Sequence, residues 1–116
     1  MSVHIPSGGY LILEPGPIVE GPGGGAIGIT LGIDSGVQPI RITSIGDLSV
    51  VGMTGGFDGR IVFVVHVGGA GAVNFPAESL SATATDRFAD AVGMDPDEGR
   101  AFIYDGSLSR WKKLTL

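Results

Sequence analysis

Large and small residues alternate along residues 26–33, and this is the first clear structural signal in the chain. Branched apolar side chains occupy every second position, at Ile27, Ile29, Leu31 and Ile33. A period of two is typical of a β-strand, because successive side chains point to opposite faces of a sheet. The intervening residues, Gly28, Thr30 and Gly32, leave the other face almost bare. A bare face suits the close approach of another backbone.

The longest apolar run, residues 61–67, follows Arg60 and has apolar side chains on both faces apart from His66. A strand of this kind needs cover on two sides. In a small domain one cover is the protein's own second sheet, and we expect the other to be a partner subunit. The predicted subunit interface is one face of this strand: Ile61, Phe63, Val65 and Val67.

Shorter apolar segments, separated by turn residues, complete the pattern. Further strands are predicted at residues 40–42, 45–51, 72–75, 100–104 and 110–114. Residues 79–92 are the only helix-compatible stretch, but Thr83 and Thr85 are poor helix formers, which predicts a loop with at most a turn or two. About seven or eight short strands predict an all-β fold: a compact antiparallel β-sandwich or barrel, or a β-prism subunit.

The N-terminal segment differs from the rest in being rich in proline and glycine around two short apolar runs, residues 10–13 and 18–19. Proline restricts φ and removes an amide donor, so this segment is predicted to form an extended arm or edge strands. The expected organisation is therefore an extended arm over residues 1–25 and a single all-β domain over residues 26–116.

Composition adds the expectation of self-association. The chain has 116 residues, which corresponds to one domain, and 43% of them are apolar whereas only 16% are charged. So few charges solvate an isolated small domain poorly, which indicates that apolar surface is buried against another chain. A symmetric homo-oligomer is the expected form.

Charge and residue usage argue against several classes of partner. A net charge of −5 lacks the cations that neutralise phosphates, so no nucleic-acid partner is expected. The apolar run at residues 61–67 is too short for a transmembrane helix, and no membrane partner is expected. The N-terminus lacks the pattern of a signal peptide, which favours synthesis in a cytosol.

Catalytic, cofactor-binding and metal-ligating residues are all predicted to be absent. A hydrolytic triad needs a histidine, and only His4 and His66 are available. Residues 23–28 satisfy the G-x-G-x-x-G pattern but are followed by an alternating strand rather than a helix. Asp95, Asp97 and Glu98 lack the spacing of a calcium loop, and the chain has no cysteine. The chain is therefore not expected to be an enzyme.

Residues 50–116 carry an ordered series of short motifs that resembles a module of phage tail fibres, spikes and capsid-associated trimers. The series comprises residues 52–56, 58–60, 73–79, 81–88 and 104–111. The resemblance implies an all-β homotrimer whose subunits surround a shared axis. It also implies a structural motif, made by Arg87, Phe88, Tyr104, Asp105, Arg110 and Trp111. The sequence departs from the family at residues 66–69, where an asparagine-glycine turn is usual.

Within this motif we expect Arg87 to form a bidentate pair with Asp105 while Phe88 and Trp111 fill the core beneath. An exposed Trp111 that anchors a partner is the alternative. The resemblance implies a virion protein, foremost a capsid decoration (cement) protein that binds the major capsid protein or other virion proteins at capsomer junctions. The alternative is a tail fibre, spike or adhesin module that recognises a host glycan or protein. A small carbohydrate-active enzyme is a third class.

Overall fold

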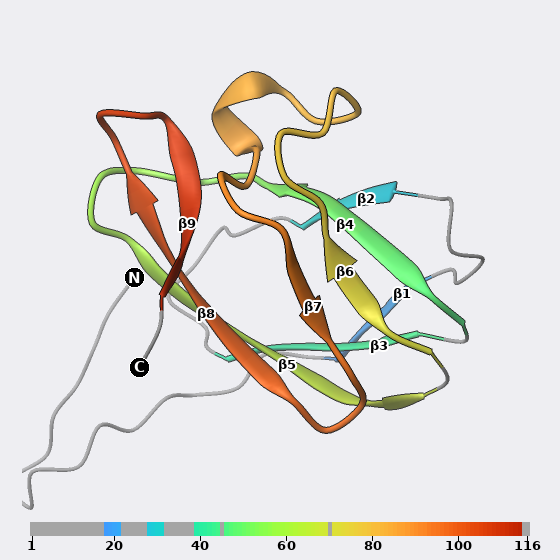
Figure 1. Cartoon of the computed structure of the whole chain (residues 1–116). Helices are drawn as coiled ribbons and strands as arrows, with labels where there is room; N and C mark the ends of the chain where they lie inside the picture. Colours follow the sequence, from blue (N-terminus) through green and yellow to red (C-terminus); the bar gives the residue numbers. More distant parts are fainter. Residues whose placement is uncertain (1–17, 22–27, 32–38, 45, 70, 115–116) are drawn as a thin grey trace, which may run out of the picture.

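The computed structural model describes residues 18–21, 28–31, 39–44, 46–69 and 71–114. These residues form two mixed β-sheets that pack against each other (Figure 1). The five-stranded sheet consists of β1 (Ile18–Gly21), β3 (Ile40–Ser44), β5 (Ile61–Gly69), β8 (Gly99–Asp105) and β9 (Arg110–Leu114), in that order. The four-stranded sheet consists of β2 (Gly28–Leu31), β4 (Leu48–Met53), β6 (Val73–Phe75) and β7 (Val92–Met94).

The first six strands alternate between the two sheets, and each of the first four pairs in parallel with the strand two places later. In the larger sheet β1 pairs with β3 and β3 with β5, while in the smaller sheet β2 pairs with β4 and β4 with β6. Arg41 of β3 lies opposite both Ile18 of β1 and Val65 of β5, so the three strands are in register at this position. The chain therefore winds through three stacked coils of two strands each, as in a short two-sided solenoid.

The last three strands close this stack with antiparallel pairing. β7 pairs with β6, β8 with β5, and β9 with β8. Two isolated bridges, Ala77 to Phe88 and Phe88 to Trp111, connect the segment after β6 to β9. This end of the stack therefore carries its own cap, as solenoid ends require.

The expected antiparallel sandwich is correct in its all-β content and wrong in its strand directions, because four of the seven strand pairings among the described residues are parallel. The reason is the connection between strands. A chain that crosses to the opposite sheet after every strand returns in its original direction, whereas a hairpin reverses it. Apolar patterning reports which residues are buried and carries no information about these crossings.

The core lies between the two sheets and is built from side chains of both. Its fully buried members include Ile42, Leu48, Val50, Met53, Val62, Val64, Val73, Phe75, Phe88, Phe102 and Trp111. The rings of Phe75, Phe88 and Phe102 lie with centroids 5.0–5.2 Å apart in tilted or edge-on orientations, which are favourable for aromatic pairs.

Most predicted segments coincide with described strands, with one difference. Residues 79–92 contain only a three-residue 3₁₀ turn, η1 (Ala84–Asp86), as expected, but β7 begins at Val92 and was not predicted. Residues 18–21 of the predicted arm form the edge strand β1. Residues 1–17 and 22–27 lie outside the described residues, as do the ends of the strand predicted at 26–33.

Candidate assembly surface

The predicted interface strand, β5, has one enclosed face and one half-exposed face. Its inward side chains, Val62, Val64 and His66, are fully buried between the sheets. The alternate side chains are those predicted for the subunit interface: Ile61, Phe63 and Val65 are half-buried, and Val67 is 36% exposed. The four residues therefore share the outer face of the larger sheet.

Neighbouring strands extend this face. On β8, Ile103 lies opposite Ile61 and Ala101 lies opposite Phe63. On β9, Leu114 lies opposite Ala101. Residues that are directly opposite in antiparallel strands project to the same side, so they form one continuous apolar surface. We call this surface the outer face: Ile61, Phe63, Val65, Val67, Ala101, Ile103 and Leu114.

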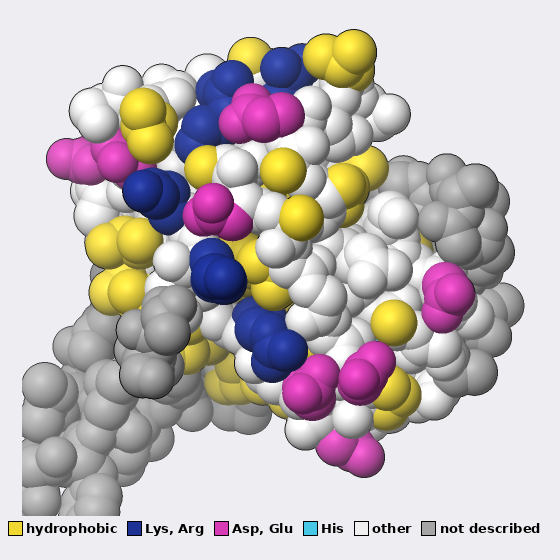
Figure 2. Space-filling view, viewed as in Figure 1, with side chains coloured by type: hydrophobic (Ala, Val, Ile, Leu, Met, Phe, Trp, Pro, Cys, Tyr) yellow, Lys and Arg dark blue, Asp and Glu magenta, His cyan; other side chains and the backbone are white. Residues whose placement is uncertain are grey.

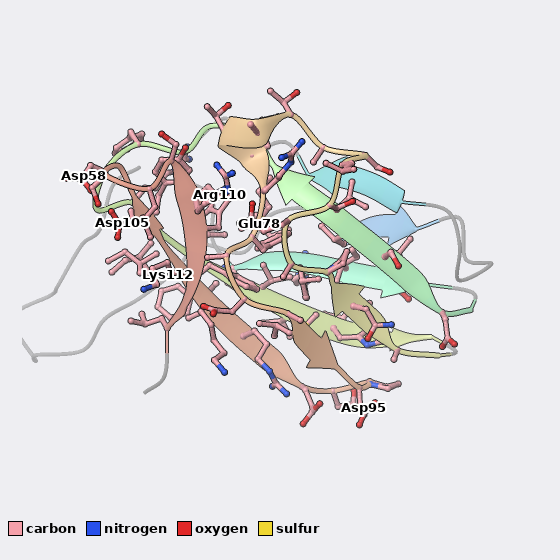
Figure 3. All side chains as sticks on the ribbon, turned by 45° about the horizontal axis from the view of Figure 1, so that its top comes forward. Asp58, Glu78, Asp95, Asp105, Arg110 and Lys112 are labelled. Carbon is pink, nitrogen blue, oxygen red and sulfur yellow. The ribbon has the colours of Figure 1, made fainter. Side chains whose placement is uncertain are left out.

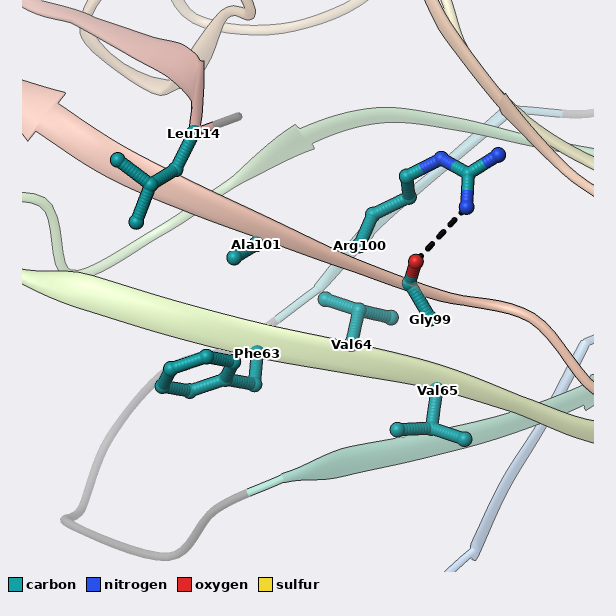
Figure 4. A pocket seen from close by; sticks show the side chains of 7 residues that line it. All are labelled: Phe63, Val64, Val65, Gly99, Arg100, Ala101 and Leu114. Atoms are coloured by element: carbon teal, nitrogen blue, oxygen red, sulfur yellow. Dashed lines mark hydrogen bonds between the residues drawn. The ribbon is translucent and has the colours of Figure 1, made fainter. Parts of the chain in front are cut away.

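A shallow hollow of about 310 Å³ lies in the outer face (Figure 4). Its lining is mostly apolar and consists of Phe63, Val64, Val65, Gly99, Arg100, Ala101 and Leu114. At one end, Arg100 Nη1 donates to the carbonyl of Gly99 at 2.8 Å, and Arg100 Nη2 lies 3.4 Å from a carboxylate oxygen of Glu98. The hollow is suited to an apolar group rather than to a polar ligand.

Cations border this apolar region. Arg100 on β8, and Lys112 and Lys113 on β9, are half-buried or exposed. Figure 2 shows a diagonal row of Lys and Arg side chains over β8 and β9, with hydrophobic side chains beside it. An acidic partner surface is therefore favoured at this border.

An arginine–carboxylate ion pair, which was predicted for Arg87, is made by another residue of the structural motif, Arg110, and its partner is Glu78. Arg110 Nε lies 2.7 and 3.0 Å from the two carboxylate oxygens of Glu78 (Figure 3). Its Nη1 donates to the carbonyl of Ala84 at 2.8 Å. The Arg110 side chain therefore connects β9 to two positions of the β6–β7 loop, Glu78 and Ala84.

The expected pair between Arg87 and Asp105 is not formed. Arg87 Nε donates to the carbonyl of Ala82 at 3.1 Å. Asp105 Oδ1 instead accepts from the amide and the hydroxyl of Ser107, at 2.9 and 2.6 Å. Aspartate at the start of a turn commonly accepts from the residue two positions later, and this local bond satisfies the Asp105 carboxylate within the β8–β9 turn.

Phe88, Tyr104 and Trp111 form a buried aromatic group, as expected for the first and last of them. Trp111 is fully buried, and its indole Nε1 donates to the carbonyl of Met53 at 2.9 Å. The Tyr104 ring lies edge-on to Trp111 at 5.1 Å, and its hydroxyl donates to the carbonyl of Thr85 at 2.8 Å. The alternative of an exposed Trp111 anchor is therefore wrong.

His66 lies in the core of the fold. Its ring is fully buried, and neither ring nitrogen has a hydrogen-bond partner among the described residues. Its backbone donates to Glu98 and accepts from Asp97, both at 2.9 Å. A fully enclosed ring has no access to a substrate at the surface, and His4 lies outside the described residues.

The Glu98 side chain closes the β7–β8 turn by bonding to the backbone. Glu98 Oε1 accepts from the amide of Asp95 at 2.7 Å, and Asp97 has a φ of 69°. Within the described ranges no group of three or more metal-ligating side chains converges. In the same part of the chain, no helix has the length and hydropathy to span a bilayer.

Comparisons with known proteins return no relative: no protein family, no curated protein and no solved structure matches this chain.

The β8–β9 turn gives a pH-dependent prediction. Chiefly because the Ser107 hydroxyl donates to it, the pKa of Asp105 lies below its ordinary value of 3.8. A carboxylate with a lowered pKa stabilises the fold above its unfolded-state pKa and loses that contribution as pH falls through its folded-state pKa. Stability should therefore decline below a pH of about 3.8, and less steeply in Asp105→Asn. Urea melts across this range provide the measurement, and equal slopes in both proteins would contradict the prediction.

Proposed function

We propose that this chain is a structural subunit of a phage virion that acts by assembling as a homotrimer through its outer face. The observation that carries the proposal is the half-exposed apolar face of β5. Within the described residues, the smaller sheet covers the inner face of the larger sheet only (Figure 1). Burying the outer face stabilises an assembly by about 25 cal/mol per Å² of apolar area removed from water.

Cations beside the outer face give the assembly its specificity. Lys112 lies opposite Ile103 of the outer face and Arg100 lines the hollow, so apolar contact supplies affinity and charge selects the partner. His66 and the acidic β7–β8 turn are engaged in the fold. The surface therefore supports a binding role rather than catalysis.

Two places in the virion fit this subunit. As a capsid decoration protein it binds the major capsid protein at capsomer junctions and adds interface free energy to the shell. As a tail fibre or spike module it recognises a host glycan or protein. A specific observation favours the second: the stacked parallel coils extend along one axis, which is the architecture of an elongated particle component.

The assembly is tested by light scattering and analytical ultracentrifugation of the purified chain. The wild type is expected at three times the mass of one chain. Val65→Glu, which places a charge in the centre of the outer face, is expected to be monomeric and folded. Asn74→Glu, which places the same charge at an exposed position of β6, is the matched control and should remain trimeric. A wild type that is monomeric at every concentration contradicts the proposal.

The place in the virion is tested by binding. Co-sedimentation with empty capsids is the expected result for the decoration protein, and retention on a glycan array is the expected result for the fibre or spike. A trimer that binds neither would leave the homotrimer in place and remove both virion roles.

A further inference from the structure

We propose that, in the homotrimer, Leu80 of one copy inserts into the hollow of the outer face of the next copy. This inference rests on the proposed function and names the contact that builds the trimer. It follows from four features of the described residues: an exposed apolar side chain, the rigid loop that presents it, a hollow of suitable chemistry, and opposite charges around the two.

Leu80 is the most exposed large hydrophobic residue in the described part of the chain. Its side chain is 87% exposed, against 55% for Phe57 and 52% for Leu108. Isolated exposed leucines are common on protein surfaces and carry no meaning by themselves. The loop around Leu80 gives this leucine its significance.

The loop that presents Leu80 is closed and held in place. Its two ends meet at the bridge between Ala77 and Phe88, where the Glu78 amide donates to the Phe88 carbonyl at 2.9 Å. Arg110 ties Glu78 to the carbonyl of Ala84, as described above. The segment is a compact loop whose ends are adjacent, a type that is frequently functional.

Packing beneath the loop adds to this rigidity. Ala82 is buried, and its carbonyl accepts from Arg87 Nε at 3.1 Å. Gly52 of β4 lies so close that a Cβ there would be 3.0 Å from the Ala82 Cβ and 2.8 Å from the Asp86 carbonyl. A side chain presented by a preformed loop loses little conformational entropy on binding.

The hollow has the chemistry that a leucine side chain requires. Side chains of Phe63, Val65, Ala101 and Leu114 line it, and its volume is about 310 Å³. Interface energy concentrates where a side chain becomes fully desolvated against such an apolar surface. The β6–β7 loop projects at the top of Figure 1, away from the sheet face that holds the hollow. The loop that carries Leu80 and the hollow are therefore separate surfaces of one copy.

The charges around the two surfaces are opposite. The loop between β6 and β7 contains Glu78, Asp86 and Asp90 but only one cation, Arg87. The strands that border the hollow contain one acidic residue, Asp105, and four cations, of which Arg110 is paired with Glu78 of the loop and the others are Arg100, Lys112 and Lys113. Complementary charge at the border of an apolar contact accelerates association and fixes its orientation.

Two different surfaces on one molecule make a head-to-tail contact, which closes into a ring when the rotation between copies allows it. A closed ring of three gives every copy one filled hollow and one inserted leucine. The contact is therefore compatible with a trimer, whereas a self-complementary patch would give a dimer.

The inference is tested first with Leu80→Ser, measured by analytical ultracentrifugation beside the wild type. We expect subunit affinity to weaken about 30-fold or more, the usual effect of truncating a central anchor. Leu108→Ser removes an exposed leucine from the β8–β9 turn and is the matched control, expected to leave the trimer intact. Raised salt should weaken the wild-type trimer, because the bordering charges are exposed.

A second measurement uses the absence of cysteine from the chain. The double variant Leu80→Cys/Val65→Cys, oxidised as a trimer, is expected to give covalent dimers and trimers on a non-reducing gel. Leu108→Cys/Val65→Cys should not. A Leu80→Ser variant that stays trimeric, together with no Leu80–Val65 cross-link, overturns the inference while the proposed function stands if Val65→Glu is monomeric. A monomeric wild type overturns both.

Discussion

Trp111→Ala is expected to lower the free energy of unfolding by about 3–5 kcal/mol, the cost of removing a large buried aromatic side chain. Trp111 is fully buried and contacts the Tyr104 ring edge-on. The substitution also removes the donor to the Met53 carbonyl, and a buried acceptor without a partner adds to the cost. Urea denaturation followed by far-UV circular dichroism measures the change.

Two controls separate packing from other effects in this experiment. Lys113→Ala, at an exposed position of the same strand, should change stability by no more than about 0.5 kcal/mol. Arg87→Ala removes one bond to the Ala82 carbonyl and is expected to cost about 0.5–1.5 kcal/mol, well below the tryptophan. A Trp111→Ala protein with the wild-type midpoint would show that the aromatic group does not hold the cap.

Gly56→Ala is expected to have the second largest effect, a loss of about 1–3 kcal/mol from overpacking. A Cβ at this position would overlap the Tyr104 ring, including its Cγ at 2.9 Å. The ring has no room to rotate away, because its hydroxyl donates to the Thr85 carbonyl and its edge packs on Trp111. The effect therefore belongs at the upper end of the range.

The control for Gly56→Ala is another glycine with open space around it. At Gly93 on β7, an added Cβ would have a single ordinary contact, 3.5 Å from Asn74 Oδ1. Gly93→Ala should therefore be neutral or slightly stabilising, since alanine loses less backbone entropy on folding. Equal losses at the two glycines would mean that loss of glycine's flexibility, and not contact with Tyr104, sets the cost.

Within the structural motif, the residue types could be predicted but the pairing of charges could not. Phe88 and Trp111 were expected in the core and are fully buried. The predicted ion pair was assigned to Arg87, whereas Arg110 makes it with Glu78. Glu78 lies 32 residues before Arg110 in the chain, so only the fold brings them together. Asp105 was unavailable to either arginine because the Ser107 amide and hydroxyl are nearer.

The strand β7 was missed for a related reason. Val92 and Met94 are buried and the intervening Gly93 is exposed, a period of two that spans only three residues. So short a pattern cannot be distinguished from the end of a loop. It becomes a strand because β6 offers an edge with which to pair.

The sequence by itself determined the all-β class, the position of the longest strand and the four outward side chains proposed as an interface. It did so because burial on a strand alternates with every residue, and this alternation is visible in the order of the residues. Tertiary structure alone decided the stacked parallel coils, the hollow between β5 and β8, and the loop that presents Leu80. Each depends on which strand lies beside which, and that choice is made by packing between segments far apart in the chain.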